Sequence, residues 1–182
     1  SYIGSDAASS NNSVLVTGPG SSWFVANDLT LGYAGSGNSL TVSDGGTVSA
    51  ASLNIASQLG SGGTLNFEGG TVNARIQFGA GAGVINFKQT NALALSSAVI
   101  MGSGTLRQLG TGTTTLSGSS LFTGAVQVSS GKLVLGGTFS SGISNITVST
   151  GGTLQAASGQ SITLNGMLNF QGRSEEHTSE LQ

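Results

Sequence analysis

A short phrase that returns along the chain constrains its fold more than any other feature. Residues 40–48 read LTVSDGGTV, and related phrases stand at residues 65–72 (LNFEGGTV) and 146–154 (ITVSTGGTL). Apolar and polar residues alternate in each phrase, which is the period of a strand with one buried face. A Gly-Gly turn follows, and a second short strand begins after it. One such unit cannot bury its own apolar face, so the units must stack on one another.

The spacing of the apolar anchors supports stacking. Successive anchors are separated by 26, 25, 20, 21, 20, 20 and 22 residues. The eight anchors are Val14, Leu40, Leu65, Ile85, Leu106, Val126, Ile146 and Leu168. We predict an all-β fold, a parallel, right-handed β-helix (β-solenoid) of about eight coils that is truncated at both ends. The alternative is a β-sandwich, whose strands also recur every 8–12 residues, but the near-constant long interval favours the solenoid.

The composition restricts the surface chemistry. Charged residues make up 7% of the chain, against roughly 25% in ordinary soluble domains, so the surface must consist of Ser, Thr, Asn, Gln and Gly. Such a neutral surface offers no electrostatic footprint for nucleic acid or anionic lipid. The chain has no Cys, which excludes disulfides, thiolate metal sites and a cysteine nucleophile.

The last ten residues differ sharply from the rest. Residues 173–182 read RSEEHTSELQ and contain the only histidine, His177. This string resembles a translated sequencing-library adapter, so we interpret it as a non-native, disordered tail and residues 1–172 as a single solenoid domain. The charged residues outside the tail are Arg75, Lys88, Arg107 and Lys132, with Asp6, Asp28, Asp44 and Glu68. Their formal charges cancel, and a Ser-His-Asp triad has no histidine outside the tail.

Two segments carry family-like motifs. Residues 3–56 contain a Gly-x-Gly-Ser-x-Trp phrase, a Leu-x-Leu-Gly phrase and a Gly-Gly-x-Val phrase. The matching residues are Gly18, Gly20, Ser21, Trp23, Leu29, Leu31, Gly32, Gly45, Gly46 and Val48. This segment resembles the repeat of type V secretion and PEP-CTERM-associated proteins. Residues 104–137, with TLSG at 115–118, FTG at 122–124 and SGKL at 130–133, resemble the autotransporter-associated β-strand repeat more closely.

These resemblances imply a function that composition alone does not give. They imply a structural or adhesin-like passenger segment of a bacterial autotransporter, exported to the cell surface, with an outer-membrane β-barrel further along the gene. Its partners would be host-surface or matrix glycans or proteins. The alternative is a secreted PEP-CTERM-type protein held in exopolysaccharide. A lesser alternative is a β-helix polysaccharide lyase or hydrolase.

The best enzymatic interpretation rests on two carboxylates. Asp44 and Glu68 each precede a Gly-Gly pair, and on adjacent coils they would lie about 5 Å apart, a separation that suits retaining glycoside hydrolysis. Asp before Gly-Gly is also ordinary turn chemistry. Lys88, at the same position on the next coil, would form a surface ion pair with Glu68. We therefore predict that the chain is not an enzyme and has no catalytic residues.

Other candidate sites have structural explanations. The chain has no G-G-x-G-x-D repeat, and four scattered carboxylates cannot build repeated calcium cages, so we predict no metal site and no cofactor. Trp23 could stack on a sugar, but packing at a coil corner is favoured. Asn66, Asn86 and Asn169 share a phase and could form a side-chain ladder. The Gly/Ala run at residues 79–83 predicts close packing of turns, because no Lys-Ser/Thr follows it to bind phosphate.

The predicted architecture also suggests self-association. A solenoid without terminal caps exposes unpaired strand edges. We therefore predict that the isolated, nearly uncharged chain associates with itself.

Overall fold

The computed structural model describes residues 1–95, 100–118, 121–136 and 142–172. The suspected tail, residues 173–182 with His177, lies outside the described residues. All the regular elements described are β-strands, and they form three sheets. The described part of the chain has no helix that could cross a membrane.

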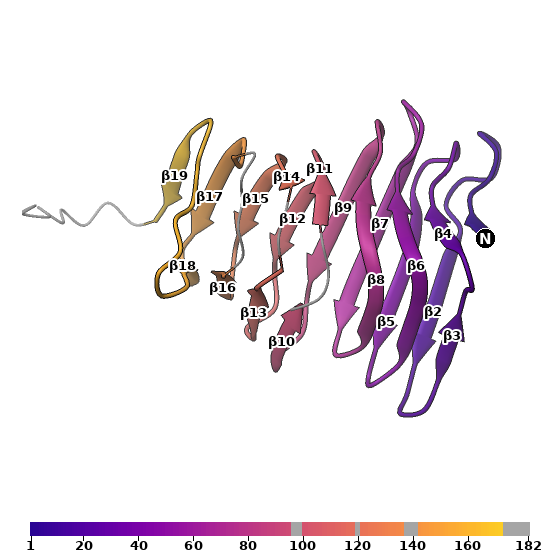
Figure 1. The fold of residues 1–182 in the computed structure, drawn as a ribbon, viewed down its shortest axis with the longest axis horizontal. Coiled ribbons are helices and arrows are strands. Elements are labelled where there is room, and N and C mark those ends of the chain that lie inside the picture. Colours follow the sequence, from indigo (N-terminus) through magenta and orange to yellow (C-terminus); the bar gives the residue numbers. More distant parts are fainter. Residues whose placement is uncertain (96–99, 119–120, 137–141, 173–182) are drawn as a thin grey trace, which may run out of the picture.

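The longest sheet has eight strands, and each pairs in parallel with its neighbour. Figure 1 shows them stacked side by side along the long axis of the molecule. In spatial order they are β2 (Ser13–Thr17), β5 (Asn38–Ser43), β7 (Gly62–Glu68), β9 (Ala82–Phe87), β12 (Thr105–Gln108), β15 (Ala125–Val128), β17 (Asn145–Ser149) and β19 (Leu168–Gln171).

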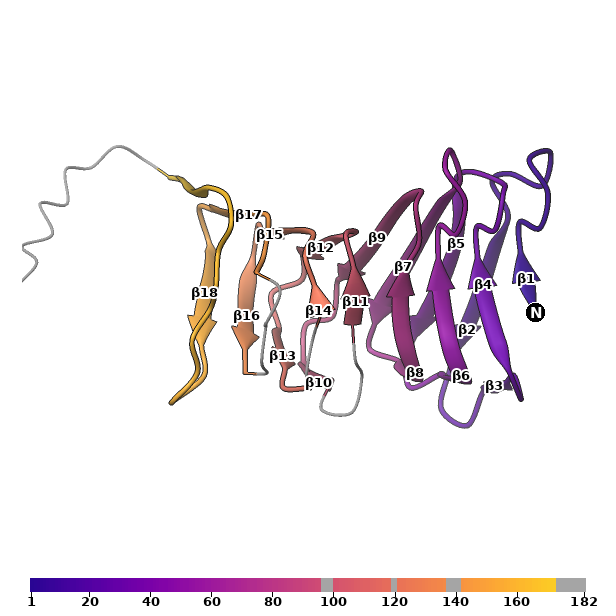
Figure 2. The same ribbon diagram turned by 45° about the horizontal axis from the view of Figure 1, so that its top comes forward.

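The other two sheets complete the wall of the solenoid (Figure 2). The seven-stranded sheet contains β1 (Tyr2–Ile3), β4 (Asp28–Leu31), β6 (Thr47–Ile55), β8 (Thr71–Phe78), β11 (Ile100–Gly102) and β14 (Leu121–Phe122), and β3 (Ser22–Phe24) also pairs with β6. The four-stranded sheet contains β10 (Ala92–Leu95), β13 (Thr113–Leu116), β16 (Gly131–Leu135) and β18 (Gly152–Ala156). The parallel β-solenoid predicted from the sequence is therefore confirmed.

The register of the eight-stranded sheet follows the predicted anchors. Val14 is the Cα partner of Leu40, Leu40 of Leu65, and Leu65 of Ile85. The same line continues through the remaining anchors, Leu106, Val126, Ile146 and Leu168. The hydrophobic phase thus sets the register, because a slip of one residue would turn every apolar side chain outward.

The number of complete turns is smaller than predicted. Six strands of the seven-stranded sheet, β1, β4, β6, β8, β11 and β14, are each followed in the chain by a strand of the eight-stranded sheet. The described residues therefore form about six turns with strands in both long sheets, rather than eight. The last two strands of the eight-stranded sheet, β17 and β19, are accompanied on that side by an isolated bridge between Ile143 and Leu164.

Side chains from facing sheets fill the interior. Leu65 and Phe67 of β7 and Leu53 and Ile55 of β6 are all fully buried and belong to one core cluster. Aromatic rings of successive coils also stack, since the Phe67 and Phe87 ring centroids are 5.4 Å apart with an angle of 26° between the rings. No charged side chain is buried among the described residues, so apolar burial and the backbone ladders hold the coils together.

The turn that carries the Gly/Ala run packs as the sequence predicts. A Cβ at Gly79 or at Gly81 would lie 2.5 Å from a backbone oxygen of the preceding coil, that of Ala56 or Ser61. Real Cβ atoms do not approach oxygen so closely, and therefore only glycine allows these turns to stack. Close packing of turns is the function of this run.

Candidate functional site

The outer face of the eight-stranded sheet presents a row of side chains in register. Each strand has two inward residues, such as Leu65 and Phe67 of β7, with one outward residue between them. We call the row formed by these outward residues the central outer row. It consists of Leu15, Thr41, Asn66, Asn86, Arg107, Gln127, Thr147 and Asn169. The strands that carry it lie about 4.8 Å apart, so neighbouring side chains in the row are within hydrogen-bonding reach of one another.

Part of the central outer row forms the predicted amide ladder. Asn86 Nδ2 donates to Asn66 Oδ1 at 2.9 Å, and Asn66 Nδ2 donates to Thr41 Oγ1 at 3.1 Å. Asn169 has the predicted phase but does not join this ladder, because the strands β12, β15 and β17 lie between β9 and β19. Residues with the same phase in their strands belong to the same row. They form hydrogen bonds with one another only where their strands are adjacent.

The predicted ion pair is present beside the ladder. Lys88 Nζ lies 3.0 Å from Glu68 Oε1, with side-chain exposures of 40% and 39%. A pair this exposed contributes about 0–1 kcal/mol to stability. Its main effect is to neutralise Glu68, which is the one carboxylate within the strands of this sheet.

Asp44 and Glu68 are brought onto adjacent turns. Asp44 has φ = 50°, a left-handed conformation that Asp tolerates better than most residues. Its backbone N–H donates to the Glu68 carbonyl oxygen at 3.2 Å. The carboxylates have different partners, however, since Asp44 Oδ2 accepts from Thr17 Oγ1 at 3.2 Å while Glu68 binds Lys88. Asp44 therefore contacts the coil before its own, and Glu68 contacts the coil after its own.

A polar hollow of about 340 Å³ opens beside these turns. Its lining comes from three successive coils and consists of Asp44, Gly45, Glu68, Gly69, Gln89, Thr90 and Asn91. A second hollow of about 140 Å³ shares Gly69, Gln89 and Asn91 with it. No aromatic side chain lines either hollow. In the described part of the chain no three His, Cys, Asp or Glu residues gather in a group that could hold a metal ion.

A buried polar cluster behind the hollow was not predicted. Gln89 Nε2 donates to Thr114 Oγ1, and Thr114 Oγ1 donates to Gln108 Oε1, both at 2.6 Å. Gln108 Nε2 then donates to the carbonyl oxygens of Gly110 and Gly112 at 2.8 and 3.2 Å. A signal existed in the sequence, because Gln108 occupies an inward position at which its register partners are Phe87 and Val128.

Trp23 packs at the edge of the core. It lies in β3, pairs with Val48 of β6 and is partly buried against the core cluster. The neighbouring Phe24 points away and is 75% exposed. The packing interpretation of Trp23 is therefore the one the structure supports.

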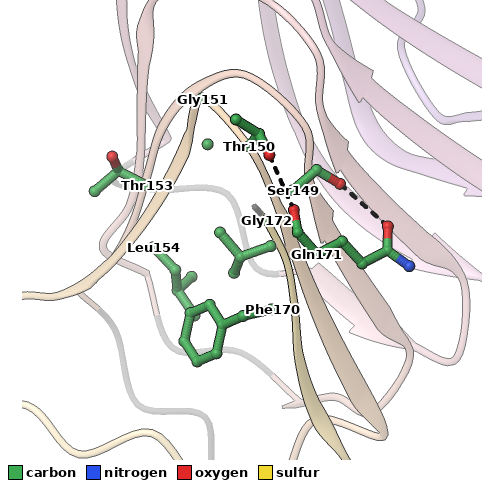
Figure 3. Close-up of a pocket in the computed structure, with 10 residues that line it drawn as sticks. Ser149, Thr150, Gly151, Thr153, Leu154, Phe170, Gln171 and Gly172 are labelled. Atoms are coloured by element: carbon green, nitrogen blue, oxygen red, sulfur yellow. Dashed lines mark hydrogen bonds between the residues drawn. The ribbon is translucent and has the colours of Figure 1, made fainter. Parts of the chain in front are cut away.

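A further hollow, of about 350 Å³, lies at the last strand of the eight-stranded sheet. Figure 3 shows Leu154 and Phe170 beside it, with Thr150 and Ser149 donating hydrogen bonds to the backbone and side-chain oxygens of Gln171 at 3.3 and 3.4 Å. Phe170 is the register partner of Val148 and is 70% exposed. This hollow is the open end of the core, because no strand of the described chain covers β19 on that side.

Comparison of the chain with known protein families, with curated proteins and with solved structures finds no match. The two repeat resemblances therefore rest on their sequence motifs alone.

Proposed function

We propose that this chain is a structural, adhesin-like passenger segment of a bacterial autotransporter, displayed at the cell surface. The observation that carries the proposal is the unbroken parallel register from β2 to β19. Backbone ladders and an apolar core stack the coils without disulfides. Such a stack is a rod whose outer faces present hydroxyl and amide groups for contacts with host-surface or matrix glycans or proteins.

The proposal also draws on the two repeat-like segments. Residues 104–137, which resemble the autotransporter-associated repeat, contribute β12 to β16 at the middle of the stack. Residues 3–56, which resemble the type V secretion and PEP-CTERM repeat, contribute β2 to β6. The second candidate, a secreted PEP-CTERM-type protein held in exopolysaccharide, draws on this latter segment.

Sequencing the gene past Gly172 to its natural stop codon distinguishes these two candidates. The passenger proposal expects more repeats and then a long segment of alternating barrel strands. A Pro-Glu-Pro motif followed by one apolar helix and a few basic residues would replace it with the exopolysaccharide-associated candidate. If the ten residues RSEEHTSELQ are encoded in the genome, the adapter interpretation is wrong.

The enzyme alternative has a separate test. Glu68 is held by Lys88 and Asp44 by Thr17, so we expect the purified chain not to cleave polysaccharides. The assay compares the parent chain with an Asp44→Asn/Glu68→Gln double variant by reducing-end release. Asp6→Asn/Asp28→Asn is the matched control, because it removes the same charge elsewhere. Cleavage that disappears in the first variant alone would establish a hydrolytic site and overturn the proposal.

A further inference from the structure

Arg107 is an unpaired cation in the middle of the outer face of the eight-stranded sheet. It stands in the central outer row of β12, between Asn86 of β9 and Gln127 of β15. No described carboxylate forms an ion pair with it, and within the described protein its guanidinium makes no hydrogen bond. The nearest acidic group within the sheet, Glu68, is already bound to Lys88.

Two orphan atoms in this row complement each other. Arg107 Nε is a buried donor without a partner, and Asn86 Oδ1 is a buried acceptor without a partner. The two residues are Cα partners on neighbouring strands. They are not hydrogen-bonded to each other in the structure, and a direct hydrogen bond between them would extend the ladder Thr41–Asn66–Asn86 by one member and hold the guanidinium in place.

The rest of the guanidinium then remains available to a ligand. Nε is the guanidinium nitrogen of Arg107 that is buried without a partner, and the residue as a whole is half-buried rather than buried. A planar guanidinium held at Nε presents its terminal N–H groups as a fork that matches the two oxygens of a carboxylate. Such a hydrogen bond at Nε would restrict rotation of the side chain, so less conformational entropy would be lost on binding.

The surroundings of Arg107 indicate the rest of the ligand. Its neighbours on this face are amide and hydroxyl side chains, namely Asn86, Gln127 and Thr105. Asn86 is buried and its amide is engaged in the ladder, whereas Gln127 and Thr105 are half-buried. These two side chains suit a ligand rich in hydroxyls, because each can donate to one hydroxyl and accept from another. The strands around Arg107, from β9 to β17, carry no acidic residue that would repel an anion.

We propose that Arg107 is the carboxylate-binding residue of a site for acidic glycans, polymers of uronic acid, on the outer face of the eight-stranded sheet. The carboxylate of one sugar binds the Nη atoms, and neighbouring hydroxyls bind the side chains of Gln127 and Thr105. This site deepens the proposed role as a surface-displayed contact rod and rests on it for its biological setting.

The test measures binding of the full 182-residue chain to polygalacturonate and to its methyl-esterified form, which keeps the backbone but lacks the carboxylate charge. We expect binding of the acid form only, and weaker binding as salt rises. Arg107→Gln removes a charge-assisted bidentate contact and is expected to weaken binding about tenfold or more. Arg107→Lys keeps the charge without the fork, so its affinity should fall between the two.

Arg75→Gln is the matched control, because it removes an equal charge from an exposed position on β8 in the seven-stranded sheet. Its affinity should stay within about twofold of the parent chain. Equal losses for Arg75→Gln and Arg107→Gln, or equal binding of the esterified polymer, would overturn the site. Binding of polyglutamate as tight as that of polygalacturonate would show a site for acidic peptide rather than glycan.

Two further readouts make the result decisive. Circular dichroism and thermal melting of each variant separate loss of the site from loss of the fold. The binding result is also independent of the gene sequence past Gly172. A protein that fails to bind can still be a passenger, and a protein of the exopolysaccharide-associated type can still bind.

Discussion

Individual side chains in this protein fall into two sets that the strand period separates. Inward residues such as Phe67 and Phe87 are fully buried and stacked, whereas outward residues such as Asn66 and Asn86 form a polar ladder. Both sets could be predicted from the sequence, because alternation fixes which side chains share a face. The ion pair between Glu68 and Lys88 could be predicted for the same reason.

Alternation of apolar and polar residues does not predict which hydrogen-bond partners a buried polar side chain finds. Gln108 sits at an inward position and becomes part of a buried cluster with Gln89 and Thr114. The partners lie on different faces of the coil, since Thr114 is in β13 and Gln89 lies in the turn after β9. The path of that turn has no period from which the contact could be predicted. The sequence also does not predict that Arg107 lacks an ion-pair partner. That outcome depends on the positions of the surrounding side chains, which alternation does not give.

The stacked rings of Phe67 and Phe87 lead to a prediction about stability. Replacing Phe67 by Ala should lower the free energy of unfolding by about 3–5 kcal/mol, because it removes a buried ring and leaves a cavity. Phe24→Ala is the matched control, since Phe24 is 75% exposed, and its effect should be within about 0.5 kcal/mol. Urea unfolding followed by circular dichroism measures both. Similar effects of the two changes would mean that the inward phase is wrongly assigned.

At the scale of single elements, a central strand is hydrogen-bonded on both sides, whereas an edge strand is hydrogen-bonded on one side only. The strand β7 pairs with β5 and β9, while β2 pairs in its sheet with β5 alone. The existence and phase of the eight strands could be predicted from the anchors. The way in which the rest of the chain divides into strands could not be predicted. For example, β6 is one bulged strand of nine residues that pairs with both β3 and β4.

This difference between central and edge strands predicts unequal tolerance of proline. Thr64 of β7 and Ser13 of β2 hold the same phase, since both align with Ser39 of β5. Thr64→Pro removes a donor between two paired strands and leaves a buried carbonyl unsatisfied, which costs about 1–3 kcal/mol. Ser13→Pro lies on an edge strand, where proline is tolerated.

Thermal melting of the two proline variants checks this prediction. We expect the melting temperature to fall clearly for Thr64→Pro and to change little for Ser13→Pro. Equal falls would contradict the assignment of β2 as an edge strand of the sheet.

At the scale of the whole molecule, β2 and β19 are the edge strands of the eight-stranded sheet among the described residues. Burial is complete at the middle of the eight-stranded sheet and declines toward β19, where Leu168 and Phe170 are 48% and 70% exposed. Exposed strand edges next to apolar side chains are templates for pairing with another chain. We therefore expect the self-association predicted from the sequence to take place at the edge strands of the stack.

Light scattering over a range of concentrations tests this location. We expect the mean mass to rise with concentration for the parent chain. Phe170→Lys should reduce the rise, because a charge on the edge strand opposes pairing. Leu59→Lys, at an 88% exposed loop residue, adds the same charge away from the ends and should leave it unchanged. A parent chain that stays monomeric at high concentration would refute open-ended association.

Cysteine cross-linking tests the register of the stack most directly, because the chain has no cysteine of its own. Thr64 and Val84 are Cα partners on adjacent strands, and Thr105 lies one strand further on. Adjacent parallel strands are about 4.8 Å apart, within the range that a disulfide spans, whereas a two-strand separation of about 9.6 Å is beyond it. The measurement is the mass shift on oxidation of two double variants with native circular dichroism. The solenoid predicts a disulfide in Thr64→Cys/Val84→Cys and none in Thr64→Cys/Thr105→Cys, and the reverse result would contradict the stacked register.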